Sequence, residues 1–367
     1  MSKRLLLIGP CPPPDGGTTL PFSLFSKYIK SEFGEEYAIK VINSNTGDKS
    51  SSSGLPFLVV FRVLKLYLKI FWGGFFSNKI VVFGSQRFIT FTGAALIILF
   101  KPLGKKVYLR VNGGAYDVFF QNSGFFVRGI ARRVLPKANR IIVQTRMVAK
   151  EMKSLWGNKV VDIPNYRELT GEPFGVREFK DNKVNFIYTG IVREQKGIRH
   201  LVDSYLRMRD LLSGSGRESI KTSLDIYGEI HPDIEGYVDH VISEGFLGIN
   251  FKGALKNNLL KEEYFSADVF VFPTFWPTEG HSGSVVEAMM SGLPILCTSW
   301  RAMPEVVDDG VSGLFFKVGD VEELANLMYS MCINAELRKK LSEGARKSGS
   351  RFDVNLVLPR MAECFEL

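Results

Sequence analysis

The sequence has few cysteines, and they are far apart. Cys11, Cys297, Cys332 and Cys364 are the only four in 367 residues, and no two of them form a Cys-x-x-Cys pair. A disulfide framework or a zinc site needs closer spacing, so neither is expected to organise this protein. We predict four ordinary thiols in a reducing compartment.

The sequence also lacks a long apolar run without charge. The longest apolar stretch, Leu55 to Phe76, contains Arg62, Lys65 and Lys69, and charges at that depth argue against a membrane-spanning helix. The first apolar run, Leu5 to Ile8, is too short for the core of a signal peptide. We therefore expect a cytoplasmic protein, with peripheral association at the inner face of the plasma membrane left open.

What is present is a globular composition with an excess of positive charge. Hydrophobic residues make up 45% and charged residues 23% of the chain, and the formal net charge is +9. This length is typical of two domains. A basic surface suits phosphates, nucleotides, nucleic acid or an anionic membrane. Because no nucleic-acid recognition motif accompanies the charge, we expect no nucleic-acid partner.

Short β-prone runs alternate with helical stretches in two series. The first series of strands is expected at residues 5–8, 38–42, 80–83, 107–111, 140–144 and 160–163. The second is expected at 184–189, 224–227, 249–252, 269–272, 294–297 and 313–316. Such alternation predicts an α/β fold of two doubly wound parallel sheets, each covered on both faces.

The same pattern predicts the domain boundaries. Residues 1–170 form the first Rossmann-like domain, 171–183 a polar linker and 184–348 the second Rossmann-like domain. Residues 349–367 are expected to form a helical segment that packs back on the first domain. Two consecutive domains of this kind are expected to face an interdomain cleft, where open α/β sheets bind ligands.

The segment from Asp268 to Ile295 carries the most chemical information. A buried strand runs into a loop of small residues, Gly280 and Ser282-Gly283-Ser284, that opens a helix. The free amides of a helix start can bind a diphosphate. Glu279 lies in the loop before this helix, and Glu287 lies about one turn into it. A helix that merely carries glutamates in its first turns is the simpler alternative.

This segment, EGxxGxxxEAMxxGxP with Glu279 and Glu287 at its fixed positions, resembles the glycosyltransferase group 1 family, known as family 4. The continuation from Pro304 to Leu314 is similar to the next signature of that family. The resemblance implies the GT-B fold, a retaining sugar transfer from a nucleotide-diphosphate sugar, and neither a cofactor nor a catalytic metal. The sequence shows no convincing Asp-x-Asp at a strand end.

Residue roles follow from the resemblance, position by position. Glu279 would meet the transferred sugar, and Glu287 would hold the ribose of the donor. Ser282, Gly283 and Ser284 would supply amides to the diphosphate or sugar. His281 lies within the segment, where we expect a loop contact to the sugar rather than general-base catalysis.

A second family loop reads Tyr188-Thr189-Gly190 followed by Arg193 and Lys196-Gly197. Lys196 matches the family lysine that contacts the donor diphosphate and neutralises the leaving group. The family arginine falls on Ile191, which is a departure from the pattern. Arg193 could reach the same diphosphate from two residues further on, or it could be a solvated loop cation.

Two loops of the first domain complete the predicted site. Gly16 and Gly17 follow the first strand and permit a close approach of the backbone to the donor. Asn112 follows a later strand, where many family members have histidine. Asparagine keeps a hydrogen bond but cannot take a proton, so Asn112 is assigned a catalytic role as a hydrogen-bonding group only. A structural asparagine in a glycine-rich turn is the alternative.

The acceptor is expected in the first domain. Arg62, Lys65 and Lys69 recur every three or four residues among apolar side chains between Phe57 and Trp72. A second basic set, Arg128 to Lys137, follows Phe125-Phe126. Such helices suit the surface of an anionic membrane, and a buried helix with a cationic outer stripe is the equal alternative. A lipid-linked saccharide is the favoured acceptor.

The sequence therefore predicts a retaining, metal-independent glycosyltransferase. The donor would be a UDP- or GDP-sugar, the acceptor a saccharide or lipid-linked saccharide, and the pathway surface polysaccharide biosynthesis. Two rivals remain: a nucleotide-sugar epimerase of the same fold, and a non-catalytic protein that binds nucleotide sugars. The departures at Ile191 and Asn112 motivate the second rival.

Overall fold

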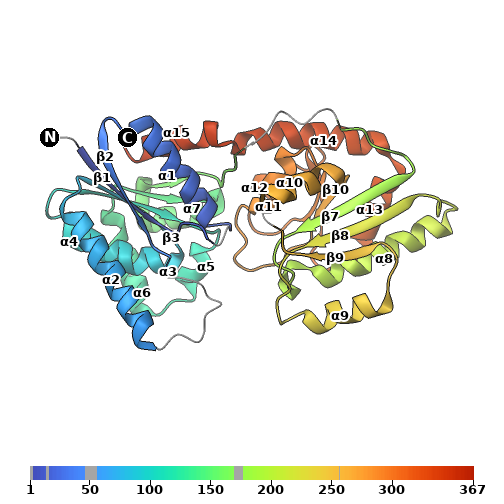
Figure 1. Ribbon diagram of the computed structural model, residues 1–367, viewed down its shortest axis with the longest axis horizontal. Coiled ribbons are helices and arrows are strands. Elements are labelled where there is room, and N and C mark those ends of the chain that lie inside the picture. Colours follow the sequence, from blue (N-terminus) through green and yellow to red (C-terminus); the bar gives the residue numbers. More distant parts are fainter. Residues whose placement is uncertain (1–2, 14–15, 46–55, 169–176, 256) are drawn as a thin grey trace. The chain divides into compact units, whose positions relative to one another are not determined.

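The computed structural model describes residues 3–13, 16–45, 56–168, 177–255 and 257–367 (Figure 1). The chain divides into two compact units. The N-terminal unit comprises Met1–Glu168 together with Val354–Leu367, and the C-terminal unit comprises Leu169–Asp353. The first predicted boundary stood at 170, and the predicted return to the first domain stood at 349. Residues 171–176 of the predicted linker lie outside the described residues.

The N-terminal unit is built on a parallel sheet of six strands, counted over the described residues, in the order β2-β1-β3-β4-β5-β6. Every pairing in it is parallel, and β1 lies between β2 and β3. The strands are β1 (Lys3–Gly9), β2 (Tyr37–Asn43), β3 (Lys79–Gly84), β4 (Lys106–Val111), β5 (Arg140–Val143) and β6 (Val160–Asp162).

Alternating side chains of this sheet enter two separate cores, as the period of a strand requires. Leu5 and Leu7 of β1 pack against α1 (Thr19–Phe33) and the C-terminal helix α15 (Val354–Cys364). Leu6 and Ile8 point to the opposite face. That face is covered by helices including α2 (Pro56–Phe75), α4 (Ala94–Phe100), α6 (Phe125–Arg133) and α7 (Arg146–Trp156). The C-terminal segment is therefore part of the N-terminal unit.

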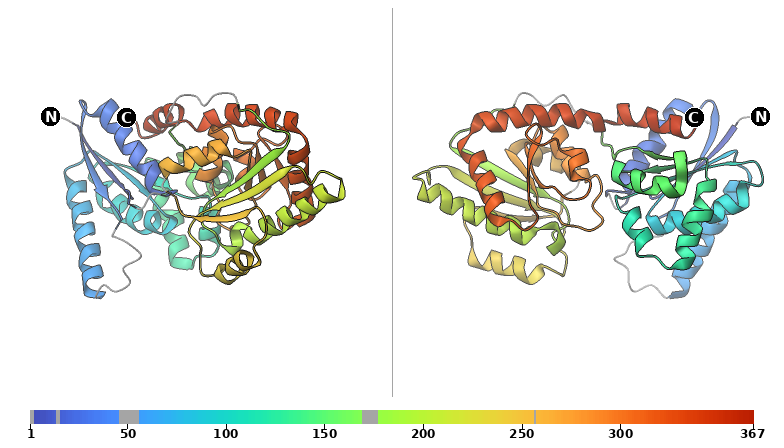
Figure 2. Two further views of the ribbon diagram at one scale, coloured as in Figure 1. Left: turned by 45° about the vertical axis from the view of Figure 1, so that its right-hand side comes forward. Right: turned by 180° about the vertical axis from the view of Figure 1, so that it is seen from behind.

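The C-terminal unit has a second parallel sheet, of six strands among those described, in the order β12-β11-β10-β7-β8-β9. Its strands are β7 (Lys183–Thr189), β8 (Lys221–Tyr227), β9 (Ile249–Gly253), β10 (Val269–Phe272), β11 (Ile295–Thr298) and β12 (Gly313–Phe316). Helices α8 (Ile198–Gly214), α9 (Glu235–Glu244), α10 (Asn257–Ser266), α11 (Gly283–Met290), α13 (Val321–Ile333) and α14 (Ala335–Gly349) surround it. α13 packs along α8, and α14 packs along α11 (Figure 2).

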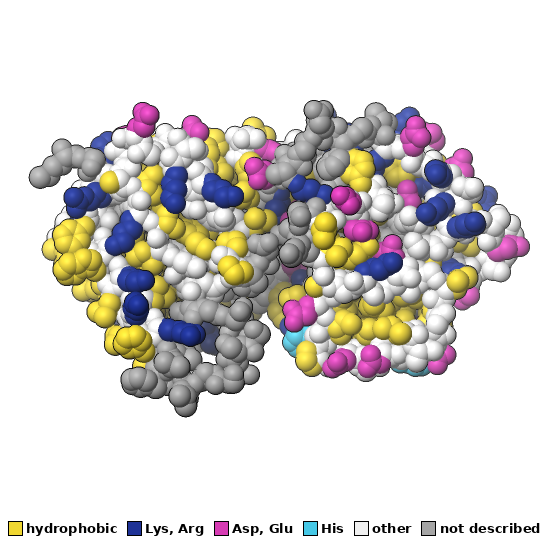
Figure 3. Space-filling model, in the orientation of Figure 1, with side chains coloured by type: hydrophobic (Ala, Val, Ile, Leu, Met, Phe, Trp, Pro, Cys, Tyr) yellow, Lys and Arg dark blue, Asp and Glu magenta, His cyan; other side chains and the backbone are white. Residues whose placement is uncertain are grey.

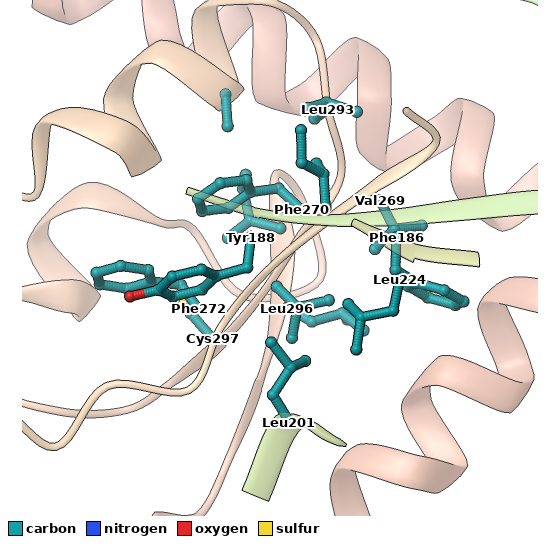
Figure 4. Packing of buried hydrophobic residues seen from close by; sticks show 14 of the residues in the cluster. Phe186, Tyr188, Leu201, Leu224, Val269, Phe270, Phe272, Leu293, Leu296 and Cys297 are labelled. Carbon is teal, nitrogen blue, oxygen red and sulfur yellow. The ribbon is translucent and has the colours of Figure 1, made fainter. Parts of the chain in front are cut away.

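The core of this unit is apolar on every central strand. Phe186, Leu224, Phe270 and Leu296 come from four different strands and point into one cluster (Figure 4). Their side chains are inaccessible to solvent. Strands that are buried on both faces are nearly all hydrophobic, which is why β10 reads Val-Phe-Val-Phe. This rigid centre holds the loops that follow β7, β10 and β11.

The predicted fold class is confirmed: both units are α/β with parallel sheets, and each predicted strand overlaps an observed one. The helical stretches expected between these strands are also present, among them α1, α8 and α11. In the described part of the chain, no helix combines the length and the apolar character needed to cross a membrane.

Candidate functional site

The strand order of the C-terminal unit reverses between two neighbouring strands. From β7 the chain proceeds outward to β8 and β9, and from β10 it proceeds the other way to β11 and β12. β7 and β10 pair directly, with Phe270 opposite Ile187. The loops at their carboxyl ends therefore separate in opposite directions. Such a switch point is where open α/β sheets bind ligands.

A buried ion pair lies at this switch point. Lys196, from the loop after β7, donates a hydrogen bond through Nζ to Glu279 Oε2 at 2.5 Å. Glu279 comes from the loop after β10, and its side chain is 8% exposed. The Thr274 hydroxyl donates to the same carboxylate oxygen at 2.7 Å. The two residues assigned from separate motifs are thus in direct contact.

Gly197 explains how Lys196 reaches this position. Gly197 has φ +77 and follows the short helix Glu194–Lys196. A Cβ atom at this glycine would lie 2.1 Å from the Pro273 carbonyl oxygen. Only glycine allows both the left-handed backbone and this close approach. The loop after β7 can therefore pack against the first residue after β10.

The Lys196–Glu279 pair is enclosed by aromatic side chains. Lys196 Nζ lies 5.2 Å from the ring centroid of Phe272 and 6.0 Å from that of Trp276. Tyr188, the penultimate residue of β7, is fully buried. Burial and then the negative charge of Glu279 raise the pKa of Tyr188 well above its ordinary value. Tyr188 is therefore a neutral hydroxyl that donates to the Ile191 carbonyl.

The start of α11 presents its backbone amides beside this pair. Ser282 is the residue before the helix, and its side chain forms no capping hydrogen bond to the first turn. Its hydroxyl instead lies 3.0 Å from the hydroxyl of Ser284. The free amides and the helix dipole together favour an anion at this end. Glu287 is half-buried one turn further along α11.

His281 is held by a carboxylate from the next loop. Its Nε2 lies 3.3 Å from Glu305 Oε2, and its ring packs edge-on against Phe352 at 6.0 Å. The imidazole is 6% exposed. Glu305 follows β11, the strand beside β10, so three adjacent strand ends supply the site. A carboxylate that contacts one ring nitrogen in this way orients the imidazole.

Arg193 pairs its guanidinium with a carboxylate other than Glu279. It donates to Asp233 Oδ2 from Nε at 3.2 Å and from Nη2 at 2.8 Å. Its guanidinium also stacks over Trp276, 4.3 Å from the ring centroid. Burial alone would raise the pKa of Asp233, but hydrogen bonds from Arg193 and from the Glu194 amide lower it. Ile191, at the family arginine position, is half exposed.

The remaining predicted site residues belong to the N-terminal unit. Gly16 and Gly17 follow β1, where the strand order of that sheet also reverses, and Gly17 has open space around it. Asn112 follows β4 and is 8% exposed, and its side-chain Nδ2 donates to no partner among the described residues. A buried amide nitrogen without a partner costs free energy, which a ligand oxygen would recover. Pro14 and Asp15 lie outside the described residues.

Sequence reasoning missed three partners of the predicted residues. Thr274, Asp233 and Glu305 hold Glu279, Arg193 and His281, respectively. Thr274 lies just beyond β10, where ligand-binding loops begin, and Glu305 lies in the short helix α12 (Met303–Val306) that follows β11. Asp233 carried no sequence signal, because its loop after β8 contains no motif.

The C-terminal unit matches a known family. Residues 183–334 match the family model described as glycosyl transferases group 1. An uncharacterized glycosyltransferase of Methanocaldococcus jannaschii is 24% identical over 295 residues, which are 75% of this chain and 73% of that protein. An uncharacterized 41.2 kDa protein in the cps region of Klebsiella pneumoniae is 23% identical over 316 residues, 83% of this chain and 80% of its own.

A shorter match joins the chain to a named enzyme. The O-antigen chain mannosyltransferase B of Escherichia coli is 30% identical over 147 residues. These residues are 40% of this chain and 36% of the enzyme.

Solved structures agree with the observed fold. Sucrose-phosphate synthase of Thermosynechococcus elongatus superposes with a TM-score of 0.74 at 15% identity, over 99% of this chain and 98% of that one. HepE of Anabaena in complex with UDP gives a TM-score of 0.73 at 16% identity, over 99% of both chains. The fold is the two-domain α/β GT-B fold. The family model and the relatives together support the glycosyltransferase group 1 family.

Proposed function

We propose that this protein is a group 1 glycosyltransferase, a retaining enzyme of family 4 that needs no metal and takes a UDP- or GDP-sugar as donor. The acceptor is a saccharide or a lipid-linked saccharide of a surface polysaccharide. The observation that carries the proposal is the buried pair of Lys196 and Glu279 at the switch point of the C-terminal sheet. The open amides at the start of α11 stand beside it.

The donor would bind mainly to the C-terminal unit. Its diphosphate would lie at the first turn of α11, with Lys196 as the neutralising cation, and its ribose hydroxyls would bind Glu287. A preformed cation in a buried site stabilises charge on a leaving group by several kcal/mol, on the order of 3. Solved structures of HepE contain UDP, UDP with glucose, and UDP-glucose, which supports a nucleotide sugar as the donor.

In the proposed mechanism, the carboxylate of Glu279 exchanges one of its two hydrogen-bond partners when the donor binds. In the structure it accepts from both Lys196 and Thr274. When a diphosphate draws Lys196 away, Glu279 keeps Thr274 and turns its other oxygen to hydroxyls of the transferred sugar. The same ion pair therefore fills the site until the donor replaces it, and it prevents either charge from being buried alone.

The transfer itself involves one bond broken and one formed. The bond between the anomeric carbon and the diphosphate oxygen breaks, and the acceptor oxygen bonds to that carbon on the same face. The acceptor proton passes to the leaving diphosphate, so no side-chain base is required. This agrees with Asn112, which can hydrogen-bond but cannot accept a proton. His281, held by Glu305, is left to contact the sugar.

A donor screen followed by product analysis tests the proposal. Thermal unfolding of the purified protein with UDP-, GDP- and ADP-sugars identifies the donor, because ligand stabilisation grows with concentration over Kd. Release of the nucleoside diphosphate then measures turnover, and NMR of the product gives its anomeric configuration. We expect the donor configuration to be retained and EDTA to leave turnover unchanged.

Two variants with a matched control locate the chemistry. Glu279→Gln and Lys196→Ala should each lower turnover by about 10²–10³, the range for removing one charge-stabilising group. Arg207→Ala removes an ion pair of the same unit that lies on the surface, with Glu322, and should leave turnover unchanged. Near-wild-type turnover of Glu279→Gln would refute the assignment.

The same assay separates the rival functions. An epimerase would convert the donor into its epimer with no acceptor present. A non-catalytic binding protein would be stabilised by a nucleotide sugar and release no nucleoside diphosphate with any acceptor. Both outcomes would contradict transfer while leaving donor binding intact.

A further inference from the structure

One region of the N-terminal unit is almost free of negative charge. Between Lys49 and Lys150 the only carboxylate is Asp117, against seventeen lysines and arginines. Asp117 is buried, with 4% exposure. The surface formed by this region therefore carries cations that no neighbouring carboxylate in the sequence neutralises. This excess of positive charge suits an external anionic partner.

The second observation is the outward face of α2. Its inner side is used for packing: Ile70 is fully buried, Gly73 fits against Leu6, and Gly74 against Phe100. Its outer side is apolar as well, because large hydrophobic side chains there are more than half exposed: Val60, Phe61, Leu64, Leu68, Trp72, Phe75 and the next residue, Phe76. A surface helix of a soluble protein normally has a polar outer side.

The exposed apolar residues continue onto neighbouring elements. α2 contacts α4, α4 contacts the π-helical turn Ile89–Gly93, and α6 contacts that turn. Each of these elements, or the residues beside it, adds exposed large hydrophobics: Phe91, Ile98, Leu99, Leu103, Phe125 and Phe126. We call this set, with the seven residues of α2 and its end, the apolar face. It is concentrated in the N-terminal unit, and exposed patches of this kind mark interaction surfaces.

The third observation is a row of cations along one edge of that face. With 3.6 residues per turn, Arg62, Lys65 and Lys69 lie together on one side of the exposed apolar arc of α2. In Figure 3, dark-blue side chains run beside yellow ones at the lower left, where Figure 1 places α2. No ion pair or hydrogen bond within the described residues engages these three side chains. Cations three and four apart repel one another on a helix.

A hollow of about 510 Å³ opens beside this row, between α2 and β2. None of the described residues that line it is acidic. Its polar lining consists of Lys40, Asn43, Asn45, Arg62, Lys65 and Lys69. Four cations and two amides around one hollow match the oxygens of a phosphate group, and the hollow is adjacent to the apolar arc of α2.

We propose that the apolar face docks the N-terminal unit on an anionic phospholipid bilayer, with headgroup phosphates bound in the hollow of Lys40, Arg62, Lys65 and Lys69. The apolar side chains of α2 enter the level of the acyl chains, and Trp72 lies at the boundary. This role does not depend on which sugar is transferred. It also accounts for the charge asymmetry of residues 49–150, which would otherwise only destabilise the unit.

A bilayer fits this surface better than a protein partner for two reasons. An interfacial helix combines an apolar half with lysines and arginines along its edge, as α2 does. Long cationic side chains can extend to the headgroups while their stems cover apolar surface. The centre of a protein interface is instead depleted in lysine. Each lysine or arginine near an anionic lipid surface increases the binding constant roughly fivefold at moderate salt.

Vesicle co-sedimentation of the full-length protein tests this proposal. Vesicles of phosphatidylcholine with phosphatidylglycerol should pellet the protein at low salt, and vesicles of phosphatidylcholine alone should pellet about tenfold less. The variant Arg62→Gln/Lys65→Gln/Lys69→Gln should lose binding by about tenfold or more, and Lys40→Gln should lose part of it. The control Lys252→Gln/Lys317→Gln/Lys340→Gln, with equal charge change on exposed residues of the C-terminal unit, should bind as the wild type does.

A second pair of variants tests the apolar face itself. Leu68→Ser/Trp72→Ser should weaken binding at every salt concentration, whereas the control Ile242→Ser/Leu247→Ser changes two exposed apolar residues of the C-terminal unit and should not. Circular dichroism confirms that each variant is folded.

Four results would overturn the proposal or its assignment of the hollow. The wild type could remain in the supernatant with phosphatidylglycerol vesicles at low salt. The charge variant and its control could bind alike. Light scattering could show a dimer that Leu68→Ser/Trp72→Ser dissociates, which would make the apolar face an interface between copies. Inorganic phosphate could also inhibit vesicle binding far more than chloride does at the same ionic strength. The hollow would then be a site for a free anion and not for a lipid headgroup.

Discussion

Gly197 illustrates how a single residue can fix the geometry of a site. Its left-handed backbone and its distance to Pro273 exclude any side chain. Gly197→Ala should lower the free energy of unfolding by about 2–4 kcal/mol, because backbone strain and a steric clash add together. Denaturant titration measures this. The control is Gly216→Ala, where φ is +69 but nothing lies within 4 Å, and a cost of only about 1 kcal/mol is expected. If both variants lost the same free energy of unfolding, the clash with Pro273 would be relieved by a local shift of the backbone.

Thr274 offers a second test at the residue scale, one that rests on the proposed function. Its hydroxyl is the second donor to the Glu279 carboxylate. Thr274→Val keeps the shape but leaves that oxygen with one donor fewer, so we expect kcat to fall by about tenfold, equivalent to ~1.4 kcal/mol. The KM for the donor should change little, since Thr274 is buried and its hydroxyl donates to Glu279.

The matched variant for this test is Thr274→Ser, which restores the hydroxyl and should restore kcat. Steady-state kinetics with the identified donor provides both parameters. If Thr274→Ser were as slow as Thr274→Val, the methyl packing rather than the hydrogen bond would matter. Thr274 would then have no part in positioning Glu279.

At the scale of elements, the sequence predicted the strands more fully than their surroundings. β10 and β7 are recognisable because central parallel strands are buried on both faces and must be uniformly apolar. Glu279 and Lys196 could be assigned because the loops after these strands resemble motifs of the group 1 glycosyltransferase family. Their mutual contact could not be predicted, since it depends on the pairing of β7 with β10, whose partners such as Phe186 and Val269 are 83 residues apart.

The partners of the site residues were less predictable for the same reason. Asp233 binds Arg193 from the loop after β8, and its position follows from the sheet order and not from any local pattern. For α2 the sequence left a membrane-surface helix and a buried helix with a cationic outer stripe as equal alternatives. Its sequence is compatible with a buried helix, and only the packing of Ile70, Gly73 and Gly74 shows which side faces the sheet.

The C-terminal helix α15 gives a prediction at this scale. Phe365, directly after it, is fully buried, and its ring contacts Phe25, Phe83 and Tyr108 at centroid distances of 5.5, 6.2 and 5.6 Å. Phe365→Ala should lower the free energy of unfolding by about 3–5 kcal/mol. Leu356→Ala, on the exposed side of α15, should change it by less than about 0.5 kcal/mol. Thermal unfolding monitored by circular dichroism compares the two, and similar midpoints would show that α15 is only loosely attached.

At the scale of the whole molecule, the N-terminal unit is discontinuous in sequence. Its two pieces meet where the Val354 amide donates to the Arg167 carbonyl oxygen at 3.1 Å. The intervening C-terminal unit, Leu169–Asp353, is therefore inserted between two adjacent points of the N-terminal unit. Each unit has its own hydrophobic core: one cluster in the C-terminal unit and two in the other. Insertions of this kind leave the host unit able to fold without the inserted one.

This arrangement predicts that residues 169–353 can be replaced by a short glycine-serine linker. The shortened protein should unfold cooperatively, because a few residues bridge the hydrogen-bonded ends and the loop-closure cost is small. Residues 1–168 alone should be much less stable, since Val357, Met361 and Phe365 no longer cover one face of the sheet. Differential scanning calorimetry should show a single transition for the linked protein, and a lower or absent one for residues 1–168. If residues 1–168 melted at the same temperature as the linked protein, α15 would contribute nothing to that face, and α1 alone would suffice to cover it.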